Sequence, residues 1–432
     1  MTPRGPGLLS LLTMADAKHS LSTRIAAGMV LGLAAGLLLG KSAAPLGELG
    51  KLVITLIKAA ATPLLFLAIL NAVLRTEVSA RAAGRMVGVA LLNASVALAL
   101  GLLLSNLLQP GRHLAAGTAA SAAAGAAAPM TQRIDLLKSA AGFVPASFVE
   151  PFVKNEIIPI VVVALLLGFG LRRARGAEAQ AAAGALLVEK GAAGLLAVME
   201  TILGWIVQLV PLAVFGVVAK ACGEHGLAPL KGLAVYVAVG LGGLALHALV
   251  TYQLWLVGYV KLSLRRFWEE AKEPVVYSIG ANSSLATLPL TLKALDNLGV
   301  SKQSSTLGAC VGTNLNNDGI ILYEAMAVLF VAQAHGLDLS LGQQILAAFF
   351  CMVAAVGIAG VPEAGFVSLS LVLTTVGLPT ELLPLLLTVD WIIARARSVV
   401  NVLSDMMVSI ILDRLDGRDF AEGPAPATAG AA

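Results

Sequence analysis

Charged residues are scarce in this sequence. Only 12% of the 432 residues are Asp, Glu, Lys or Arg, whereas 58% are hydrophobic. Soluble domains contain about 25% charged residues, so this chain lacks the polar side chains that would cover a water-exposed surface. The formal net charge of +4 says little about partners, because the positions of charges matter more than their sum. The composition excludes a soluble globular protein, and we expect no nucleic-acid partner.

Cysteine is also rare. The three cysteines lie in apolar contexts without the spacing of metal ligands; they are Cys222, Cys310 and Cys351. This pattern predicts neither a disulfide framework nor a zinc site.

The motifs of membrane-embedded enzymes are missing as well. A serine hydrolase would need a histidine close to Ser283 or Ser284, but the five histidines fall in loops or in a remote apolar run. No GxGD motif of an intramembrane aspartyl protease surrounds Asp318 or Asp405. We therefore expect that the chain is not an enzyme and has no organic cofactor.

Long apolar runs dominate the first 260 residues. Runs of about 20 apolar residues predict transmembrane helices, so the chain is expected to be a polytopic protein of the lipid membrane. The runs lie at about residues 23–40, 51–73, 84–108, 147–171, 191–222 and 230–260. Residues 109–140 are rich in Ala, Gly, Ser and Thr, which predicts a flexible loop.

In the second half of the sequence the apolar runs are interrupted by polar residues, glycine and proline. Residues 274–300 and 341–375 each contain polar or Gly- and Pro-rich breaks, which predict hairpins that enter and leave the membrane on one side. Residues 302–334 form a span broken near residues 313–319, and residues 416–432 form a tail of Ala, Gly and Pro that we expect to be disordered. Paired irregular segments of this kind predict an inverted-repeat secondary transporter with its site at mid-membrane.

A charged helix is predicted between residues 388 and 411. At about 100° per residue, Asp390, Arg397, Asn401 and Asp405 fall within roughly an 80° arc of one face, while Arg395 points elsewhere. The planar fork of Arg397 suits a carboxylate, and the oxygens of Asn401 and Asp405 suit a hard cation such as sodium. The alternative is that these charges pair with other helices for structural reasons only.

Basic residues orient the spans. They cluster in the loop at 74–85, after residue 171, after residue 260 and in the tail. The positive-inside rule then places both termini in the cytoplasm, and we expect the inner membrane of a bacterial cell.

Four motifs in the second half resemble a known family. They are SSLATLP at 283–289, NNDG at 316–319, GIAGVPEAG at 357–365 and DWIIARARSVVNVLSD at 390–405. In order and spacing the chain resembles the dicarboxylate/amino acid:cation symporters, the family of the glutamate transporters, over nearly its whole length.

The resemblance implies an all-α elevator-type transporter. Its fold would be eight transmembrane helices plus two re-entrant helical hairpins, assembled as a homotrimer. Residues 22–73 and 141–222 would form a static scaffold domain. Residues 84–108 and 230–415 would form a transport domain that moves across the membrane.

The resemblance also implies a carboxylate site. Arg397 would hold the distal carboxylate of the substrate, with Ser398 and Asn401 in the same pocket. The other carboxylate would meet Ser283 and Ser284 of the first hairpin and backbone near Val361 and Gly365 of the second.

Cation sites are implied on the same grounds. Na+ is the expected coupling ion, with H+ as a further candidate. One site would use Asp405, Asn316, Asn401 and the backbone at Gly312, and another would use Asp318, Asn316 and Asn93. Glu324 stands where animal glutamate transporters carry a proton-accepting glutamate, although a structural pair with an arginine is an equal alternative.

Departures from the family pattern bear on the substrate. The amino-acid carriers have Asp where this chain has Ala394, and a methyl group cannot bind an ammonium ion. This favours an unaminated diacid such as succinate, malate or fumarate, with symport of glutamate or aspartate as the alternative. Other departures are Asn317 and Ile320 in the broken span, Ile358 and Glu363 in the second hairpin, Asn282 in the first, and Arg395, where animal members place an arginine.

Overall fold

The computed structural model describes residues 21–75, 80–114, 145, 147–154, 157–177, 179–356 and 364–420, and the regular secondary structure of these residues is helical. The first half contains α2 (Leu21–Leu39), η2 (Gly40–Leu46), α3 (Gly47–Arg75), α4 (Ala80–Leu108), α7 (Glu150–Lys154), α8 (Ile157–Arg175), α9 (Ala179–Val207) and α10 (Val210–His225). The second half contains α11 (Ala228–Leu246), η4 (His247–Thr251), α12 (Tyr252–Leu254), η5 (Trp255–Val260), α13 (Leu264–Ala281), α14 (Ser284–Asn297), α15 (Lys302–Ser305), η6 (Thr306–Val311), η7 (Gly312–Asn314), α16 (Asp318–Ala334), α17 (Leu341–Val356), α18 (Ala364–Thr375) and α19 (Leu383–Leu415).

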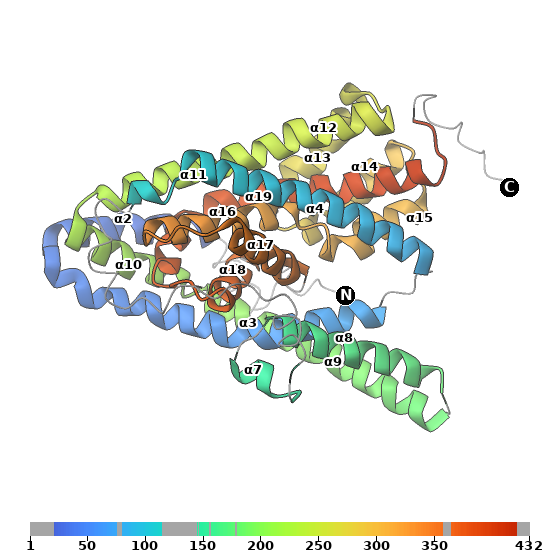
Figure 1. Ribbon diagram of the computed structural model, residues 1–432, viewed down its shortest axis with the longest axis horizontal. Coiled ribbons are helices and arrows are strands. Elements are labelled where there is room, and N and C mark those ends of the chain that lie inside the picture. The colour runs from blue at the N-terminus through green and yellow to red at the C-terminus, as the bar shows by residue number, and fades with distance from the viewer. Residues whose placement is uncertain are drawn as a thin grey trace, which may run out of the picture.

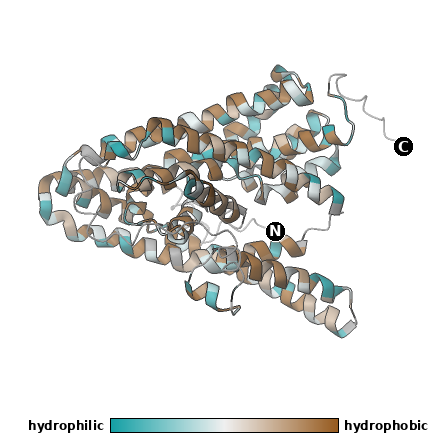
Figure 2. Ribbon diagram, viewed as in Figure 1, coloured by the Kyte–Doolittle hydropathy of each residue, from teal (hydrophilic) through white to brown (hydrophobic). Residues whose placement is uncertain are grey.

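Most of the long helices run roughly along one direction of the molecule (Figure 1). Within the described residues, four segments are long and apolar enough to cross a membrane: Thr23–Leu74, Arg81–Leu114, Gln180–His225 and Leu230–Val260. Hydrophobic residues extend along these helices (Figure 2). The predicted all-α membrane architecture is confirmed at this level, while the number of eight spans stays a prediction.

Two helices form the centre of the bundle. Every residue of α16 is buried, as is most of α19 from Leu383 to Asp413. These two helices contact each other, and α4 and α11 each pack against both of them. A helix that is buried on all sides is expected to be apolar on every face. The polar groups that α16 and α19 carry are buried as well, so they need hydrogen-bond partners within the protein.

Glycines bring α2 and α10 into direct backbone contact. A Cβ atom added at Gly28, Gly32 or Gly36 would lie 2.5, 2.5 or 2.6 Å from a backbone oxygen of α10. This spacing of one glycine every four residues keeps one face of α2 free of side chains, as in closely packed membrane helices.

Two short helix pairs occur where the sequence predicts hairpins. Between α13 and α14, Asn282 has a left-handed backbone (φ 49°), and Ser283 caps α14 by accepting a hydrogen bond from the Ala286 N–H at 3.2 Å. The helices α17 and α18 also contact each other, but their connection at 357–363 lies outside the described residues, and so do Ile358, Val361 and Glu363. That either pair is re-entrant stays a prediction.

The predicted tail begins with ordered structure. Asp416 forms an ion pair with Arg85 of α4, and Phe420 is buried under the Arg418 guanidinium. The order therefore continues to residue 420, whereas residues 421–432 and the greater part of the predicted loop at 109–140 lie outside the described residues.

Candidate functional site

A buried ion pair lies at the middle of α19. The Arg397 guanidinium donates two hydrogen bonds to the Asp390 carboxylate, both at 3.0 Å, and it lies 4.1 Å from the centre of the Tyr323 ring. Both members of the pair are almost completely buried. The helical spacing placed these two residues on one face, and the structure brings them into contact.

The start of α18 lies directly on Arg397. A Cβ atom at Gly365 would lie 2.7 Å from Nη1 of Arg397, so only glycine leaves the guanidinium in its present place. On another side, a Cβ atom at Gly319 would lie 2.5 Å from the Arg397 carbonyl oxygen. Backbone from α16 and from α18 therefore encloses the arginine closely.

The turn between α13 and α14 approaches the same face. The Ser398 hydroxyl donates a hydrogen bond to Oδ1 of Asn282 at 3.1 Å, and the adjacent Ser284 is buried at the first position of α14. The structure thus joins Ser283 and Ser284 of one helix pair with Ser398, close to Arg397 and Gly365. The α13–α14 turn therefore contacts α19 at Ser398, next in sequence to Arg397, and the start of α18 contacts Arg397 itself.

Asn401 and Asn317 tie three helices together. The Gly319 N–H donates to Oδ1 of Asn401 at 2.9 Å, and Nδ2 of Asn401 donates to Oδ1 of Asn317 at 3.3 Å. Nδ2 of Asn317 in turn donates to the Ala355 carbonyl oxygen of α17 at 3.0 Å. The sequence marked Asn317 only as a departure from the family pattern, whereas the structure shows that it links α16, α17 and α19.

Asp405 lies against the broken segment before α16. Its carboxylate accepts hydrogen bonds from the Thr313 hydroxyl at 3.0 Å and from Nδ2 of Asn316 at 3.1 Å. Gly312 is adjacent, since a Cβ atom there would lie 2.9 Å from Nδ2 of Asn316. Oδ1 of Asn316 is buried and has no hydrogen-bond partner among the described residues. The structure thereby brings Gly312, Asn316 and Asp405 together and adds Thr313.

Asp318 lies in a second buried polar cluster. Its Oδ2 accepts hydrogen bonds at 2.8 Å from the Tyr252 and Ser404 hydroxyls, and Nε2 of His247 lies 3.5 Å away. Oδ1 of Asp318 has no hydrogen-bond partner in the described part of the chain. The sequence motifs do not point to His247, Tyr252 or Ser404, and the only signal for them is that each is a polar residue within an apolar run.

Asn93 is buried in α4, which packs against α16. Neither its amide oxygen nor its amide nitrogen has a hydrogen-bond partner within the described residues, and no hydrogen bond joins it to Asp318 there.

Glu324 is fully buried in α16 beside Cys351 of α17. Within the described residues its carboxylate forms no hydrogen bond to an arginine, although the Arg397 guanidinium is near enough to act on it electrostatically. Both the proton-binding role and the structural pair with an arginine stay predictions.

The two residues predicted to govern substrate selectivity, Ala394 and Arg395, lie between Asp390 and Arg397 in the sequence of α19. Ala394 is buried, whereas Arg395 is half-buried and donates a hydrogen bond to the Trp391 carbonyl oxygen at 2.5 Å, with its guanidinium 5.7 Å from the Trp391 ring centre. Arg395 and Arg397 therefore contact different partners, as their helical spacing requires.

The described residues contain no group of three His, Cys, Asp or Glu side chains that could hold a transition metal. A site for Na+ in this protein would combine single carboxylates with amide and carbonyl oxygens, which are ligands that hard cations accept.

Comparisons with known proteins identify relatives of this chain. The family model described as the sodium:dicarboxylate symporter family matches residues 21–415. The chain is 31% identical to C4-dicarboxylate transport protein 3 of Ralstonia nicotianae over 416 residues, covering 90% of this chain and 88% of the relative. It is 29% identical to the C4-dicarboxylate transport protein of Deinococcus radiodurans, covering 92% and 89%. It is 37% identical over 193 residues to excitatory amino acid transporter 3 of Mus musculus, covering 44% of this chain and 37% of the relative.

The family model and the names of the relatives identify an integral membrane transport protein and not an enzyme, and the apolar helical bundle with buried polar side chains is consistent with this class. The chain belongs to the sodium:dicarboxylate symporter family, which confirms the resemblance drawn from the four motifs.

Proposed function

We propose that this protein is a secondary active, cation-coupled symporter of small C4 dicarboxylates such as succinate, malate or fumarate. The observation that carries the proposal is a buried Arg397 that adjoins Ala394, one turn earlier on α19, where an amino-acid carrier needs a carboxylate. Arg397 supplies a planar donor for a carboxylate group. A methyl group at residue 394 leaves a substrate ammonium without an anionic partner.

In the proposed pose, the distal carboxylate of the substrate meets Arg397, Ser398 and Asn401. The second carboxylate meets Ser283 and Ser284 at the α13–α14 turn and the backbone at the start of α18. The hydrogen bond between Ser398 and Asn282 and the approach of Gly365 to Arg397 support this arrangement, because they bring both helix pairs to one face of α19.

Sodium is the proposed coupling ion. Asp405, Asn316 and Gly312 would form one site, and Asp318 would form the centre of another, with Asn93 and Asn401 among the contributing residues. Buried polar atoms that lack a partner call for an explanation such as an ion. The oxygens Oδ1 of Asn316, Asp318 and Asn93 are buried atoms of this kind among the described residues. Glu324 is the candidate for a coupled proton.

We further propose a homotrimer whose transport domain moves as an elevator against a scaffold that contains α2, α3 and α10, with both termini on the cytoplasmic side of a bacterial inner membrane. The starts of α4 and α13 and the turn between α8 and α9 lie at one end of the bundle (Figure 1). Basic residues concentrate near these segments, which supports a cytoplasmic location for that end.

Uptake by the purified protein in liposomes tests this function. Sodium and proton gradients are imposed separately, and labelled succinate is offered with competing malate, fumarate, aspartate or glutamate. We expect saturable succinate uptake that requires sodium and that aspartate does not inhibit. Flux that does not saturate and persists without a coupling cation would indicate a channel instead.

Symport of glutamate or aspartate is the second candidate. The identity to mouse excitatory amino acid transporter 3 over 193 residues favours it. Inhibition of succinate uptake by aspartate at equal or lower concentration than malate would establish this alternative.

A further inference from the structure

A hollow of about 160 Å³ lies at the end of the bundle where α19 terminates, and its lining residue Leu412 is about four helical turns beyond Arg397 on that helix (Figure 1). Residues of four elements line it. Arg81 and Arg85 come from α4, Gln303 and Leu307 come from α15 and η6, and Leu412 and Asp416 come from the end of α19. Its volume is below the roughly 300–1,000 Å³ of pockets for drug-sized ligands, so it suits a small group.

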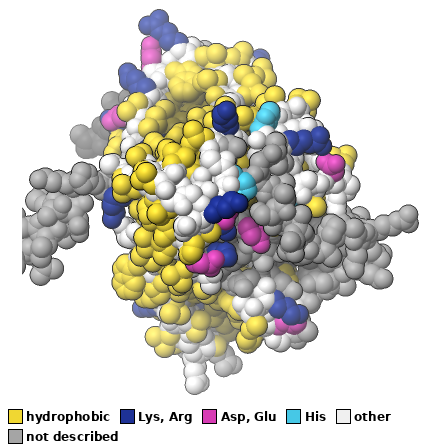
Figure 3. Space-filling model, turned by 90° about the vertical axis from the view of Figure 1, so that its left-hand side faces the viewer, with side chains coloured by type: hydrophobic (Ala, Val, Ile, Leu, Met, Phe, Trp, Pro, Cys, Tyr) yellow, Lys and Arg dark blue, Asp and Glu magenta, His cyan; other side chains and the backbone are white. Residues whose placement is uncertain are grey.

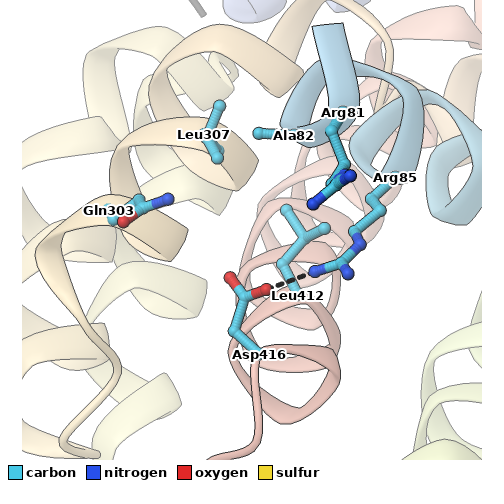
Figure 4. A pocket seen from close by; sticks show the side chains of 7 residues that line it. All are labelled: Arg81, Ala82, Arg85, Gln303, Leu307, Leu412 and Asp416. Carbon is cyan, nitrogen blue, oxygen red and sulfur yellow. Dashed lines mark hydrogen bonds and ion pairs between the residues drawn. The ribbon is translucent and has the colours of Figure 1, made fainter. Parts of the chain in front are cut away.

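The charges in this hollow are predominantly positive. Figure 4 shows the guanidinium groups of Arg81 and Arg85 pointing into the space between α4 and α19. Asp416 pairs with Arg85 at 2.5 Å, so one carboxylate opposes two guanidinium groups. The side-chain amide of Gln303 adds a donor that can bind an anion without bringing charge.

One wall of the hollow is apolar. Leu307 and Leu412 belong to a small cluster with the buried side chains of Met86 and Val408. A ligand that fits here therefore combines an anionic head, held by arginines, with an apolar portion that leaves along the leucines.

The position of the hollow matches an anionic surface. It lies at the same end of the bundle as the basic segments described above, whereas the opposite end, where α2 turns into α3, shows charges of both signs scattered among apolar side chains (Figure 3). Anionic lipids concentrate in the cytoplasmic leaflet, and basic pockets between transmembrane helices bind their head groups.

We propose that Arg81, Arg85 and Gln303 form a binding site for a phosphate-bearing anion. Phosphate oxygens accept several charge-assisted hydrogen bonds, and arginine is well suited to donate them. Asp416 regulates the site, because it competes with the anion for Arg85. Occupancy fastens α4, α15 and α19 to one another. This site is separate from the carboxylate site proposed above and does not depend on the identity of the transported substrate.

Titration calorimetry on the purified protein in an uncharged detergent tests the proposal with three probes: dihexanoyl phosphatidylglycerol, zwitterionic dihexanoyl phosphatidylcholine and inorganic phosphate. The variants are Arg81→Gln, Asp416→Asn and the matched control Arg173→Gln. Arg173 lies on α8, is exposed and does not line the hollow. Size-exclusion chromatography establishes that each variant is folded.

We expect phosphatidylglycerol to bind more tightly than phosphatidylcholine. Arg81→Gln should weaken this binding about fivefold, which corresponds to one arginine near an anionic head group. Asp416→Asn should strengthen it, since Arg85 loses its competing carboxylate, and Arg173→Gln should leave it unchanged. A purely structural role of these residues would not produce tighter binding in Asp416→Asn.

The probes distinguish the two sources of the anion. If inorganic phosphate binds as tightly as phosphatidylglycerol, and if the three variants change its affinity in the same directions, the ligand is free phosphate and not a lipid. If Arg81→Gln changes the affinity of neither phosphatidylglycerol nor inorganic phosphate, the site does not exist. The same conclusion follows if Arg81→Gln and Arg173→Gln weaken binding equally. Should Arg81→Gln fail to fold, an unchanged affinity in Asp416→Asn overturns the proposal by itself.

Discussion

Arg397 and Asp390 are seven residues apart on one helix and still share two hydrogen bonds of 3.0 Å. Seven residues rise about 10 Å along an α-helix, and the long arginine side chain spans this distance because side chains point toward the N-terminus of their helix. The pair holds the guanidinium in a fixed plane within a buried environment. Orientation of this donor fork, and not charge alone, is what a planar carboxylate requires.

Replacing Arg397 by Lys tests the importance of the fork. Lysine keeps the charge but loses the paired donors, and one hydrogen bond to a charged group contributes about 1.5–3 kcal/mol. The affinity for succinate should therefore fall at least about tenfold in a liposome uptake assay. Arg265→Lys is the matched control, since the Arg265 side chain is 88% exposed. Equal affinities in both variants would remove Arg397 from the substrate site.

Asp318 and Asp405, the two carboxylates of the proposed sodium sites, should govern sodium dependence. Asp318→Asn and Asp405→Asn each remove a negative charge while preserving size, so the sodium concentration for half-maximal uptake should rise at least about tenfold. Asp338→Asn should have no effect, because the Asp338 side chain is 85% exposed. Uptake that ignores sodium in the unaltered protein and follows only a proton gradient would contradict this coupling and direct attention to Glu324.

Ala394→Asp should change the substrate preference. The unaltered protein is expected to prefer succinate over aspartate by orders of magnitude, because breaking a buried charge pair costs about 3–5 kcal/mol. The new carboxylate should attract the ammonium group of aspartate and repel an unaminated diacid. Competition between aspartate and succinate for uptake measures both effects. If the unaltered protein already takes aspartate as well as succinate, another group binds the amine.

Gly365→Ala should affect binding without unfolding the protein. Its Cβ atom would lie 2.7 Å from the far end of the Arg397 side chain, which can shift to make room. We expect weaker succinate binding and an unchanged unfolding temperature. The control is Gly194→Ala, where no atom lies within 4 Å of the added Cβ. Weakening of the same size in the control would contradict the role of Gly365 in placing Arg397.

Gly32→Ala should destabilise the fold. The added methyl would meet the Phe215 carbonyl oxygen at 2.5 Å, and backbone yields less easily than a side chain. Overpacking of this kind costs about 1–3 kcal/mol, which lowers the thermal midpoint in detergent. Gly191→Ala meets no atom within 4 Å and should stabilise its helix slightly, since alanine favours a helix by up to about 1 kcal/mol over glycine. Opposite signs in the two variants are therefore expected.

The sequence predicted those features that follow from local geometry. The common face of Asp390 and Arg397 follows from the period of a helix, and the position of the break beside Asn316 follows from polar residues in an apolar run. The partners of Asp318 did not follow. Tyr252 and His247 lie in the long apolar segment Leu230–Val260, and the sequence does not show which face of that segment turns toward α16. The bridging role of Asn317 depends on the placement of α17 and could not be read from the residues beside it.

The glycines of α2 have a mechanical consequence. Carbonyl oxygens of α10 lie where side chains would otherwise separate the two helices, so the backbones interlock and cannot slide past each other without first moving apart. We therefore expect the helices α2 and α10 to move together as one rigid unit. If parts of this protein move relative to each other, we expect the movement to occur elsewhere, across contacts between apolar side chains that can slide past one another.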